Sequence, residues 1–512
     1  NNTAEIRISA QPIDALRYTI DALFLFNNHS LDRLRPRLTK DSVLYGEANF
    51  ITEEDKQRLS FVEVPLTELA KQAGNKLFIN TVLFGYIAGM LDIDKKNCVE
   101  LITSRFTKLG EEMIAGNLKA FNLGYDISNS DPKKIVREKP KGFVERKVFT
   151  GNHALMIGAL AGGVNYLAAY PMSPGTSLMS MLSEKSHAFG VLVEQAEDEI
   201  AAINMVQGAW YAGARAMTTT SGGGFALMSE GISLAGMTET PAVIHVAQRP
   251  GPATGLPTRT EQADLNLVVY AGHGEFPRVV YAPATIEDGV ELAARAFWMA
   301  DKYQIPVFLL SDQYWLESMV AAAPKVPQNY LEHFIQETKL GYQRYAFDPS
   351  GISPRGIPGF GKGFVKVDSD EHDENGAITE SFDMRVKMHE KRLGKFGLML
   401  KDEVEPRTYG KEDAKHLLIG WGSTYGVLRE YVDTHEDTQL MQLRQVYPLP
   451  ASLEAKINKA ASVIVVENNA TGQLANLMQM KFGRKFDKRI LKYTGEPFFI
   501  EEIERRIKEV SI

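Results

Sequence analysis

The sequence predicts an α/β protein in which helices pack against parallel sheets. Three observations lead to this prediction. Between residues 150 and 312, short β-rich runs alternate with helical segments, and the alternation resumes near residue 413. Strands separated by helices of this length require right-handed crossovers and therefore pair in parallel. The length of 512 residues exceeds what one ordinary core can serve, so we expect roughly three domains.

The composition is that of a soluble globular protein, with 44% hydrophobic and 24% charged residues. A net charge of −7 gives no electrostatic reason to expect nucleic acid or an anionic membrane as a partner. No apolar run approaches the ~20 residues of a bilayer span, and no signal peptide is expected. Cys98 is the only cysteine, which is typical of a cytoplasmic protein and excludes an iron–sulfur cluster or zinc site built from cysteines of this chain alone.

Residues 1–130 predict an α/β domain whose N-terminal part is missing. "AEIRIS", at residues 4–9, alternates like a strand that has no preceding turn. Helical apolar spacing then recurs in "KLFINTVLFGYIAGMLDI" and "LITSRFTKLGEEMIAGNLKAFNLGYDI". Residues 131–149, which begin with the basic "DPKKIVREKPKGFVERK", predict a linker.

Residues 150–345 predict the main α/β domain. Asn152 is a plausible cap for the first helix, "NHALMIGALAGGV". Strands and helices then alternate in "NYLAAYP", "VLVEQ", "EDEIAAINMVQGAWYAG", "RAMTTT", "GFALMSEGISLAGM", "PAVIHVAQ" and the segment 278–312. Residues 346–410 predict an irregular connection because their first part has low hydrophobicity. Residues 411–512 predict a small, separate parallel-sheet domain.

Four strands of the main domain end in polar loops. These loops begin at "YPMSP", "VLVEQAEDE", "TTTSGGG" and "HVAQRPG". Because the carboxyl ends of parallel strands meet at one edge of the sheet, the four loops should line one crevice. Open α/β sheets bind their ligands at such an edge, although each loop could also be a simple turn.

Two features of these loops have a structural and a functional interpretation. The turn Gly222–Gly224 can approach a phosphate closely, but without a flanking Lys the tight-packing interpretation is the stronger one. Glu197–Glu199 begin a helix, where carboxylates favour the positive end of the dipole. The helix behind them is apolar almost all round, so a carboxylate there can be buried and useful for proton chemistry.

Arg249 follows a hydrophobic strand and precedes the rigid loop "PGPATGLPT". An isolated arginine is more often a surface or salt-bridge residue. At the mouth of the crevice, however, its guanidinium suits a bidentate carboxylate, and Thr254 and Thr258 supply hydroxyls beside it.

Taken together, five segments resemble the alpha subunit of the 2-oxoacid:ferredoxin oxidoreductases, most closely the 2-oxoglutarate type. The segments are "YPMSPGTS", "EQAEDEIAAINMVQGAWYAGARAMTTTSGGGFALMSEG", "HVAQRPGPATGLPTRTEQADL", "SDEHDE" and "VVENNATGQL". The resemblance implies a thiamine pyrimidine-binding domain at 150–345 and a transketolase-C-like domain at 411–512. Residues 1–130 resemble the gamma domain that many members carry ahead of alpha, without its early Gly-rich portion.

The resemblance implies that this chain contributes the pyrimidine side of a thiamine diphosphate site. Pro171 and Ser173 would border the cofactor, with Gly222 and Gly223 beside them. Glu199 aligns with the acid that activates the pyrimidine ring, a choice over Asp198 that helical periodicity alone does not make.

The implied substrate residues lie in the same loops. Ser173, which stands where the family usually has Thr, would place its hydroxyl near the reacting carbonyl and carboxylate of the 2-oxoacid. Arg249 matches the arginine that binds the substrate carboxylate, Thr258 matches a residue associated with substrate selection, and Thr254 lies close to both in sequence.

The chain carries neither a "GDG…N" motif for Mg²⁺ and diphosphate nor cysteines for a [4Fe–4S] cluster. The resemblance therefore implies a beta subunit that supplies both, in a dimer of alpha–beta heterodimers with no metal site in this chain. "DEHDE" is interpreted as a solvated loop rather than a metal site.

The implied reaction is the reversible conversion of 2-oxoglutarate, coenzyme A and oxidised ferredoxin to succinyl-CoA, carbon dioxide and reduced ferredoxin. Pyruvate or a broader range of 2-oxoacids is the alternative substrate, and a non-catalytic scaffold subunit is the alternative function. An NAD-dependent dehydrogenase is disfavoured because no G-x-G-x-x-G follows a strand.

Overall fold

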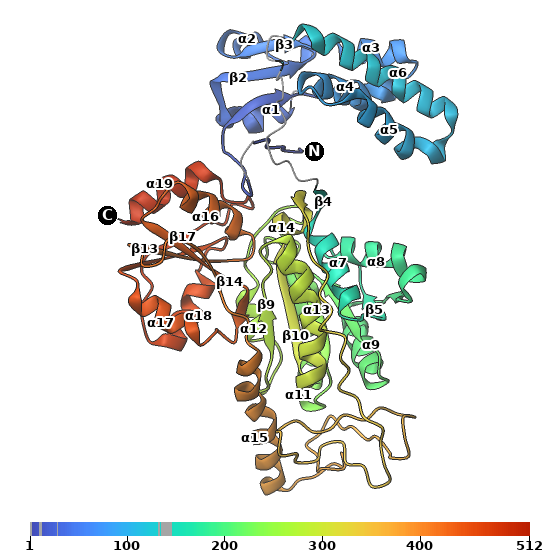
Figure 1. Cartoon of the computed structure of the whole chain (residues 1–512), viewed down its shortest axis with the longest axis vertical. Helices are drawn as coiled ribbons and strands as arrows, with labels where there is room; N and C mark the ends of the chain where they lie inside the picture. Colours follow the sequence, from blue (N-terminus) through green and yellow to red (C-terminus); the bar gives the residue numbers. More distant parts are fainter. Residues whose placement is uncertain (1–2, 10–12, 28, 132–133, 135–145, 512) are drawn as a thin grey trace. The chain divides into compact units, whose positions relative to one another are not determined.

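A computed structural model describes residues 3–9, 13–27, 29–131, 134 and 146–511. The chain divides into two compact units (Figure 1). The first unit comprises Asn1–Gln11 and Arg17–Glu145, and the second comprises Pro12–Leu16 and Arg146–Ile512. In the described part of the chain, no helix combines the length and the apolar character needed to cross a membrane.

The first unit has a parallel sheet, which in its described residues runs in the order β1-β2-β3. Its strands and longer helices are β1 (Ile20–Phe24), β2 (Leu38–Gly46), β3 (Ser60–Glu63), α3 (Leu66–Ala73), α4 (Ile79–Met90), α5 (Lys95–Phe106) and α6 (Glu111–Ile127). Short helices α1 (His29–Leu34) and α2 (Glu53–Arg58) lie beside the strands in sequence. Glycine allows α4 and α6 to approach closely, because a Cβ on Gly85 would lie 2.1 Å from the Phe121 carbonyl oxygen. The α/β character of this region is confirmed.

The strand predicted at "AEIRIS" is wrong. Residues 4–9 have no strand structure, and Ile6 and Ile8 are 81% and 56% exposed. Alternation produces a strand only where one face can pack on a core and the backbone finds a pairing partner. The linker predicted at 131–149 lies mostly outside the described residues, but its end, β4 (Lys147–Phe149), is a strand that pairs with β11 (Val320–Ala322).

Within the described residues, the second unit holds a large sheet, here called the central sheet, with the order β15-β9-β10-β8-β7-β5-β6. The strands are β5 (Tyr166–Ala169), β6 (Leu192–Gln195), β7 (Ala216–Thr220), β8 (Ala242–Gln248), β9 (Val279–Tyr281), β10 (Pro306–Asp312) and β15 (Gln445–Tyr447). All described pairs are parallel except β15 with β9. The predicted parallel pairing of "RAMTTT" with "PAVIHVAQ" is confirmed, with Met217 opposite Val243.

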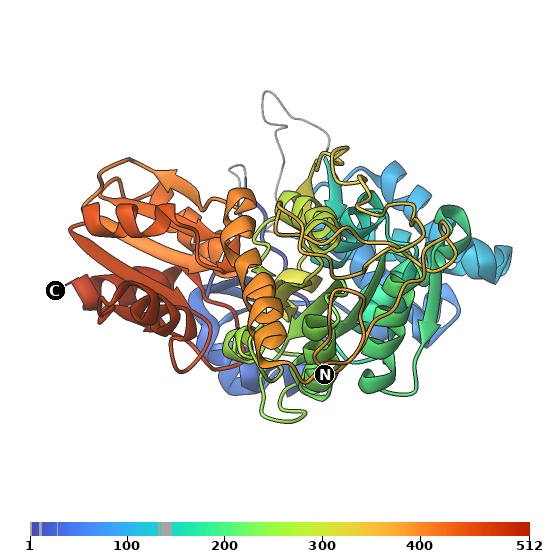
Figure 2. The ribbon, with the colours of Figure 1, turned by 90° about the horizontal axis from the view of Figure 1, so that it is seen from below.

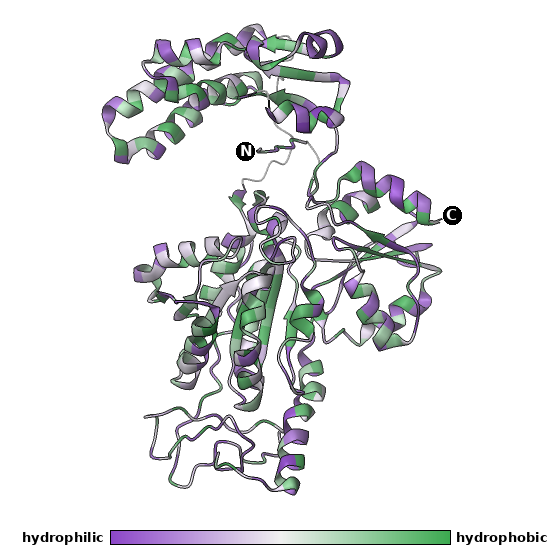
Figure 3. Cartoon of the chain, turned by 180° about the vertical axis from the view of Figure 1, so that it is seen from behind, coloured by the Kyte–Doolittle hydropathy of each residue, from purple (hydrophilic) through white to green (hydrophobic). Residues whose placement is uncertain are grey.

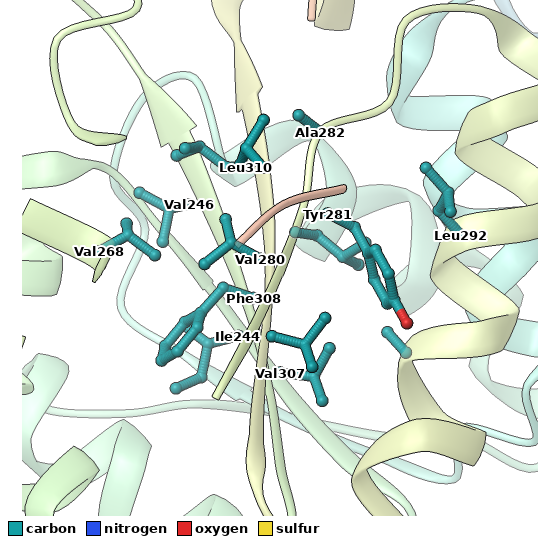
Figure 4. Packing of buried hydrophobic residues seen from close by; sticks show 14 of the residues in the cluster. Ile244, Val246, Val268, Val280, Tyr281, Ala282, Leu292, Val307, Phe308 and Leu310 are labelled. Atoms are coloured by element: carbon teal, nitrogen blue, oxygen red, sulfur yellow. The ribbon is translucent and has the colours of Figure 1, made fainter. Parts of the chain in front are cut away.

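Helices connect these strands and bury them. The main ones are α7 (Gly151–Ala161), α8 (Thr176–Phe189), α9 (Glu199–Tyr211), α10 (Gly222–Leu227), α11 (Ser229–Met237), α12 (Leu265–Val269) and α13 (Ile286–Tyr303). Figure 3 shows hydrophobic residues along the strands of the central sheet. Figure 4 shows Ile244, Val246, Val280, Val307, Phe308 and Leu310 packed together from three adjacent strands, β8, β9 and β10.

The cap predicted for α7 is wrong. Thr150 caps the helix by accepting from the His153 backbone N–H, and the His153 side chain accepts from the Thr150 backbone N–H. Asn152 instead lies inside the helix, is buried, and donates to the Leu316 carbonyl oxygen at 3.0 Å. Thr150 is also a favoured cap residue, and its capping box leaves Asn152 to make a buried tertiary hydrogen bond.

Residues 346–381 are irregular as predicted, but the predicted extent of 346–410 is wrong. α15 (Phe382–Met399) is an 18-residue helix, and β12 (Arg407–Gly410) is a strand. A buried ion cluster attaches α15 to the end of α11: Lys391 and Lys395 each place Nζ 2.6 Å from a carboxylate oxygen of Glu239. Burial opposes a charge on Glu239, yet the two lysines hold its pKa well below its usual value.

The C-terminal sheet, in its described residues, has the order β12-β14-β13-β16-β17. Its further elements are β13 (His416–Trp421), α16 (Thr424–Asp433), β14 (Thr438–Leu443), α17 (Ser452–Lys459), β16 (Ser462–Glu467), α18 (Gln473–Phe482), β17 (Arg489–Leu491) and α19 (Ile500–Ser511). β12 is antiparallel to β14, and the other pairs are parallel.

The C-terminal sheet, whose residues 411–512 were predicted as a domain, lies in the same compact unit as the central sheet. β15 follows β14 in the chain but pairs with β9 of the central sheet, and both sheets belong to the second compact unit. Figures 1 and 2 show the two sheets side by side. One hydrophobic cluster draws residues from both sheets.

Candidate active site at the carboxyl edge of the central sheet

β8, β7, β5 and β6 are consecutive neighbours in the central sheet and run in the same direction. Their carboxyl ends therefore open on one edge, as the sequence predicted. The loops that follow β5, β7 and β8 contact one another there, as the following distances show. This edge is the candidate site.

The loop after β5, residues 170–175, is anchored to the strands beside it through its backbone. Arg249, immediately after β8, donates from Nη1 to the Ser173 carbonyl oxygen at 2.7 Å and places Nη2 3.7 Å from the Met172 sulfur. The Thr219 hydroxyl on β7 donates to the Gly175 carbonyl oxygen at 3.2 Å. The structure thus brings Arg249 and Ser173 together, but through the Ser173 backbone, while the Ser173 side chain is exposed.

Arg249 keeps donors for a ligand. The two contacts to the 170–175 loop occupy two of the five N–H groups of the guanidinium. The residue is half-buried, so the remaining groups can meet a carboxylate in a partly dehydrated setting, where charge-assisted hydrogen bonds are strong.

The three acids at the start of α9 have three different environments. Glu197 is exposed, and Asp198 caps the helix by accepting from the Ala201 backbone N–H at 2.7 Å. Glu199 is only 3% exposed, and among the described residues its Oε1 atom has no hydrogen-bond partner. A buried carboxylate oxygen without a partner is costly unless a ligand supplies one. The structure therefore distinguishes Glu199 from Asp198, which helical periodicity could not.

Two glycines on the turn that begins α10 leave room for carboxyl groups from other parts of the chain. A Cβ on Gly224 would lie 2.3 Å from Glu199 Oε1 and 2.2 Å from the Thr220 hydroxyl. A Cβ on Gly222 would lie 2.4 Å from Asp264 Oδ2. Tight packing therefore accounts for these two glycines. The middle glycine, Gly223, is exposed, and a Cβ there would have the Ala253 carbonyl oxygen as nearest neighbour at 3.9 Å.

Asp264 is a site residue that the sequence analysis missed. Burial raises its pKa to about 6, Glu261 adds to the rise, and Arg249 opposes it. Its Oδ2 atom has no partner among the described residues, while its backbone N–H donates to Gln248 at 3.0 Å. The only available signal was an acid between apolar residues in "EQADL", directly after the loop that follows β8.

The remaining predicted residues lie in the same loops but are less engaged. Pro171 is partly buried in the 170–175 loop. Thr254 and Thr258 are exposed on the loop after Arg249, and within the described part of the chain neither hydroxyl is hydrogen-bonded to Arg249. The expectation that these hydroxyls lie beside the guanidinium therefore has no contact to support it.

The interpretation of "DEHDE" as a solvated loop is wrong. Glu371 accepts from Arg392 at 2.7 Å and from Arg385 at 2.7 Å. His372 is fully buried, with its ring centroid 3.9 Å from that of Tyr345. In the part of the chain that the structure describes, no three or more His, Cys, Asp or Glu side chains are grouped as a metal ion would require.

A cavity of about 390 Å³ lies elsewhere, between α11 and α15. Its lining includes Met237, Phe276 and His389. Met237 ends α11, just before β8 begins, so this cavity lies toward the amino-terminal edge of the sheet. None of the predicted site residues lines it.

Two family models match the chain. Residues 157–391 match a family described as pyruvate flavodoxin/ferredoxin oxidoreductase, thiamine diphosphate-binding, and residues 1–127 match one described as pyruvate ferredoxin/flavodoxin oxidoreductase. The candidate site lies within the first match.

Curated proteins and a solved structure resemble the chain over about two thirds or nearly all of its length. The alpha subunit of 2-oxoacid:ferredoxin oxidoreductase 1 from Sulfurisphaera tokodaii is 32% identical over 96% of this chain and 82% of its own length. The 2-oxoglutarate synthase subunit KorA from Archaeoglobus fulgidus is 31% identical over 65% of this chain and 90% of its own length. The structure of 2-oxoglutarate:ferredoxin oxidoreductase from Magnetococcus marinus, with 2-oxoglutarate, coenzyme A and succinyl-CoA bound, aligns with a TM-score of 0.89 at 30% identity. That alignment covers 98% of this chain and 90% of the other.

Proposed function

Because the chain belongs to the family of 2-oxoacid:ferredoxin oxidoreductase alpha subunits, we propose that it forms the pyrimidine side of a thiamine diphosphate site in a 2-oxoglutarate:ferredoxin oxidoreductase. The enzyme would convert 2-oxoglutarate, coenzyme A and oxidised ferredoxin to succinyl-CoA, carbon dioxide and reduced ferredoxin. One observation carries the proposal: Glu199 is buried against Gly224 with an unpartnered oxygen, at the sheet edge that also holds Arg249.

The residues at this edge fit the cofactor. When bound, thiamine diphosphate supplies the nucleophilic carbon and the electron sink on which decarboxylation of a 2-oxoacid depends. Glu199 would form a hydrogen bond with a ring nitrogen of the pyrimidine, which would give the unpartnered Oε1 atom a partner. Gly222 and Gly223 would border the ring on one side, with Pro171 and Ser173 on the other.

Arg249 and Ser173 are proposed to bind the substrate. The free N–H groups of Arg249 would hold the carboxylate next to the 2-oxo group, and the exposed Ser173 hydroxyl would donate to the reacting end of the molecule. Thr254 and Thr258 would meet the distal part of the substrate, because both are exposed on the loop that follows Arg249.

The choice of 2-oxoglutarate is supported by the KorA relative and the Magnetococcus marinus enzyme, whose names or bound molecules include it. Pyruvate, or a broader range of 2-oxoacids, is the second candidate, because other relatives carry the general name 2-oxoacid:ferredoxin oxidoreductase. A charge-assisted site for the distal carboxylate would give 2-oxoglutarate a kcat/KM roughly a hundredfold or more above that of pyruvate.

A beta subunit is proposed to complete the enzyme. The relative from Sulfurisphaera tokodaii is named as an alpha subunit, which implies partner subunits. This chain has one cysteine, and Cys98 is buried in the first unit, so the [4Fe–4S] cluster would lie on the partner together with Mg²⁺ and the diphosphate site. Two alpha–beta heterodimers would form the complex, which would use ferredoxin as electron acceptor in the cytoplasm.

The test replaces Glu199 in the complex reconstituted with its beta subunit. Glu199→Gln keeps the side chain's shape but cannot exchange the proton, so ferredoxin reduction by 2-oxoglutarate and coenzyme A should fall at least about a hundredfold. Glu197→Gln, at the exposed acid two residues earlier, is the matched control and should stay near wild-type activity. Full activity of Glu199→Gln would refute the catalytic assignment and favour a scaffold role. Equal kcat/KM for 2-oxoglutarate, pyruvate and 2-oxobutyrate would refute the substrate assignment alone.

A further inference from the structure

A buried hydrogen-bonded chain runs across three strands of the central sheet beneath the candidate site. His245, on β8, is fully buried. Its Nδ1 atom lies 2.8 Å from the Thr219 hydroxyl on β7, and its Nε2 atom lies 2.8 Å from the Ser311 hydroxyl on β10. Thr219 is the direct cross-strand neighbour of His245, and β8 lies between β7 and β10. A polar chain inside an otherwise apolar sheet therefore spans these strands.

The contacts fix the direction of each hydrogen bond. The Thr219 hydroxyl donates to the Gly175 carbonyl oxygen, so its oxygen must accept from His245 Nδ1–H. The Nε2 atom then accepts from the Ser311 hydroxyl. This arrangement needs a neutral imidazole with one donor and one acceptor. Burial lowers the pKa of His245 to about 3, which keeps the ring neutral at every working pH.

The hydrogen-bonded chain reaches the backbone of the 170–175 loop at Gly175. Gly175 is packed so tightly on β7 that a Cβ there would lie 2.8 Å from the Thr219 hydroxyl and 3.1 Å from the Thr220 carbonyl oxygen. The loop therefore has two backbone anchors on either side of Pro174: Thr219 at Gly175, from inside the sheet, and Arg249 at Ser173, from the open edge.

The two anchors differ in what a substrate would do to them. Arg249 is half-buried and is the residue proposed to meet the substrate carboxylate, so this anchor is in direct contact with the bound substrate. Thr219, His245 and Ser311 are each at most 2% exposed and out of reach of a ligand. Their hold on the loop therefore does not depend on the substrate contact at Arg249.

We propose that Thr219, His245 and Ser311 are positioning residues that fix the 170–175 loop, and with it the Ser173 hydroxyl, for binding of the 2-oxoacid. This inference rests on the proposed function of that loop and adds residues to the site that touch neither substrate nor cofactor. Because one buried hydrogen bond typically contributes a few-fold to tenfold in an equilibrium constant, its loss should raise the KM of the 2-oxoacid roughly three- to tenfold. The kcat should change less than the KM.

Two adjacent threonines provide a matched test. Thr219→Val removes the hydroxyl that joins His245 to Gly175 and preserves the side-chain shape. Thr218→Val makes the same substitution one residue earlier on the same strand, at a fully buried hydroxyl that has no partner among the described residues. Successive residues of a strand point to opposite faces, so Thr218 does not face His245.

Each variant is measured in the complex with the beta subunit, by steady-state kinetics and by hydrogen–deuterium exchange of the peptide covering residues 170–180. Thr219→Val should accelerate exchange in that peptide and raise the KM, whereas Thr218→Val should change neither. Ser311→Ala, at the far end of the hydrogen-bonded chain, should have the same effects to a smaller degree. Ser311→Thr keeps a hydroxyl and should leave both the exchange rate and the KM near their wild-type values.

The two measurements separate the inference from the proposed function. Unchanged exchange in Thr219→Val and Ser311→Ala would overturn the anchoring role, whatever the kinetics. Faster exchange with an unchanged KM would overturn the substrate role of the 170–175 loop, since a loosened loop would then not affect binding. Equal effects of Thr218→Val and Thr219→Val would mean that packing, and not the hydrogen bonds of Thr219, determines the result. That outcome would overturn the inference as well.

Discussion

Replacement of Asp264 by asparagine should make the stability difference from the wild type depend on pH. The carboxyl of Asp264 is buried beside Gly222 with an unpartnered oxygen, and its pKa is raised from 3.8 to about 6. A carboxyl whose pKa is raised by folding favours the folded state in its protonated form. Its contribution to stability is therefore complete below pH 3.8 and is lost as the pH rises through 6.

The size of the effect follows from the shift. The difference between 6 and 3.8 is 2.2 pKa units, and at about 1.4 kcal/mol per unit the wild type loses at most about 3 kcal/mol of unfolding free energy across this range. Asparagine has nearly the same shape but does not titrate. The unfolding free energy of Asp264→Asn minus that of the wild type should therefore increase with pH by up to about 3 kcal/mol.

Urea unfolding followed by tryptophan fluorescence suits this measurement, because all four tryptophans, Trp210, Trp298, Trp315 and Trp421, lie in the second unit. Titrations at intervals between pH 4 and pH 8 give the difference directly, since the other carboxyl groups cancel between the two proteins. Glu197→Gln, at an exposed acid of the same edge, serves as the control. A difference that does not vary with pH would refute the raised pKa, and a difference that decreases with pH would show that folding favours the charged form.

Two further predictions concern glycine and a buried ion cluster. Gly224→Ala should displace the carboxyl group of Glu199 and weaken thiamine diphosphate binding to the complex at least tenfold, as measured by calorimetry. Gly208→Ala is the control and should bind normally, because a Cβ at this exposed position of α9 would have no neighbour within 4 Å among the described residues. Equal affinities of the two variants would contradict the packing argument. Glu239→Gln should destabilise the second unit by about 3–5 kcal/mol in urea unfolding, because Lys391 and Lys395 lose their buried counter-ion. A loss below about 1 kcal/mol would mean that water reaches these lysines.

The parts of the fold that could be predicted from the sequence depend on short-range patterns. The strands that end at Ala169 and Gln248 are mostly apolar runs, each with a Pro two residues after its end. Parallel pairing follows from the helices between the strands. The same local rule failed at residues 4–9, where alternation is present but no core covers Ile6 and Ile8. It also failed at 382–399, where the helix is held by buried ions rather than by an apolar stripe alone.

The site was predictable only as far as neighbouring residues determine it. Ser173 and Arg249 follow β5 and β8, which flank β7 in the parallel sheet, so the sequence could place them at one edge. Which of their atoms meet, a guanidinium and a backbone carbonyl, depends on the path of the loop. Asp264 was missed because its raised pKa comes mainly from burial, and the groups that bury it include Gly222, 42 residues earlier in the chain. His245 was missed because a histidine inside "PAVIHVAQ" gives no sign of the hydroxyls on the strands beside it.

The pairing of β15 with β9 has a consequence for how the chain can be divided. A fragment that ends before residue 445 would leave the backbone N–H and C=O groups along that side of β9 exposed at the border of the central sheet. Such a border is a template for strands of other molecules, and the fragment would aggregate rather than fold as a free-standing catalytic module. A gene split between the two sheets would therefore be functional only if the separate C-terminal piece still delivered residues 445–447 to that border.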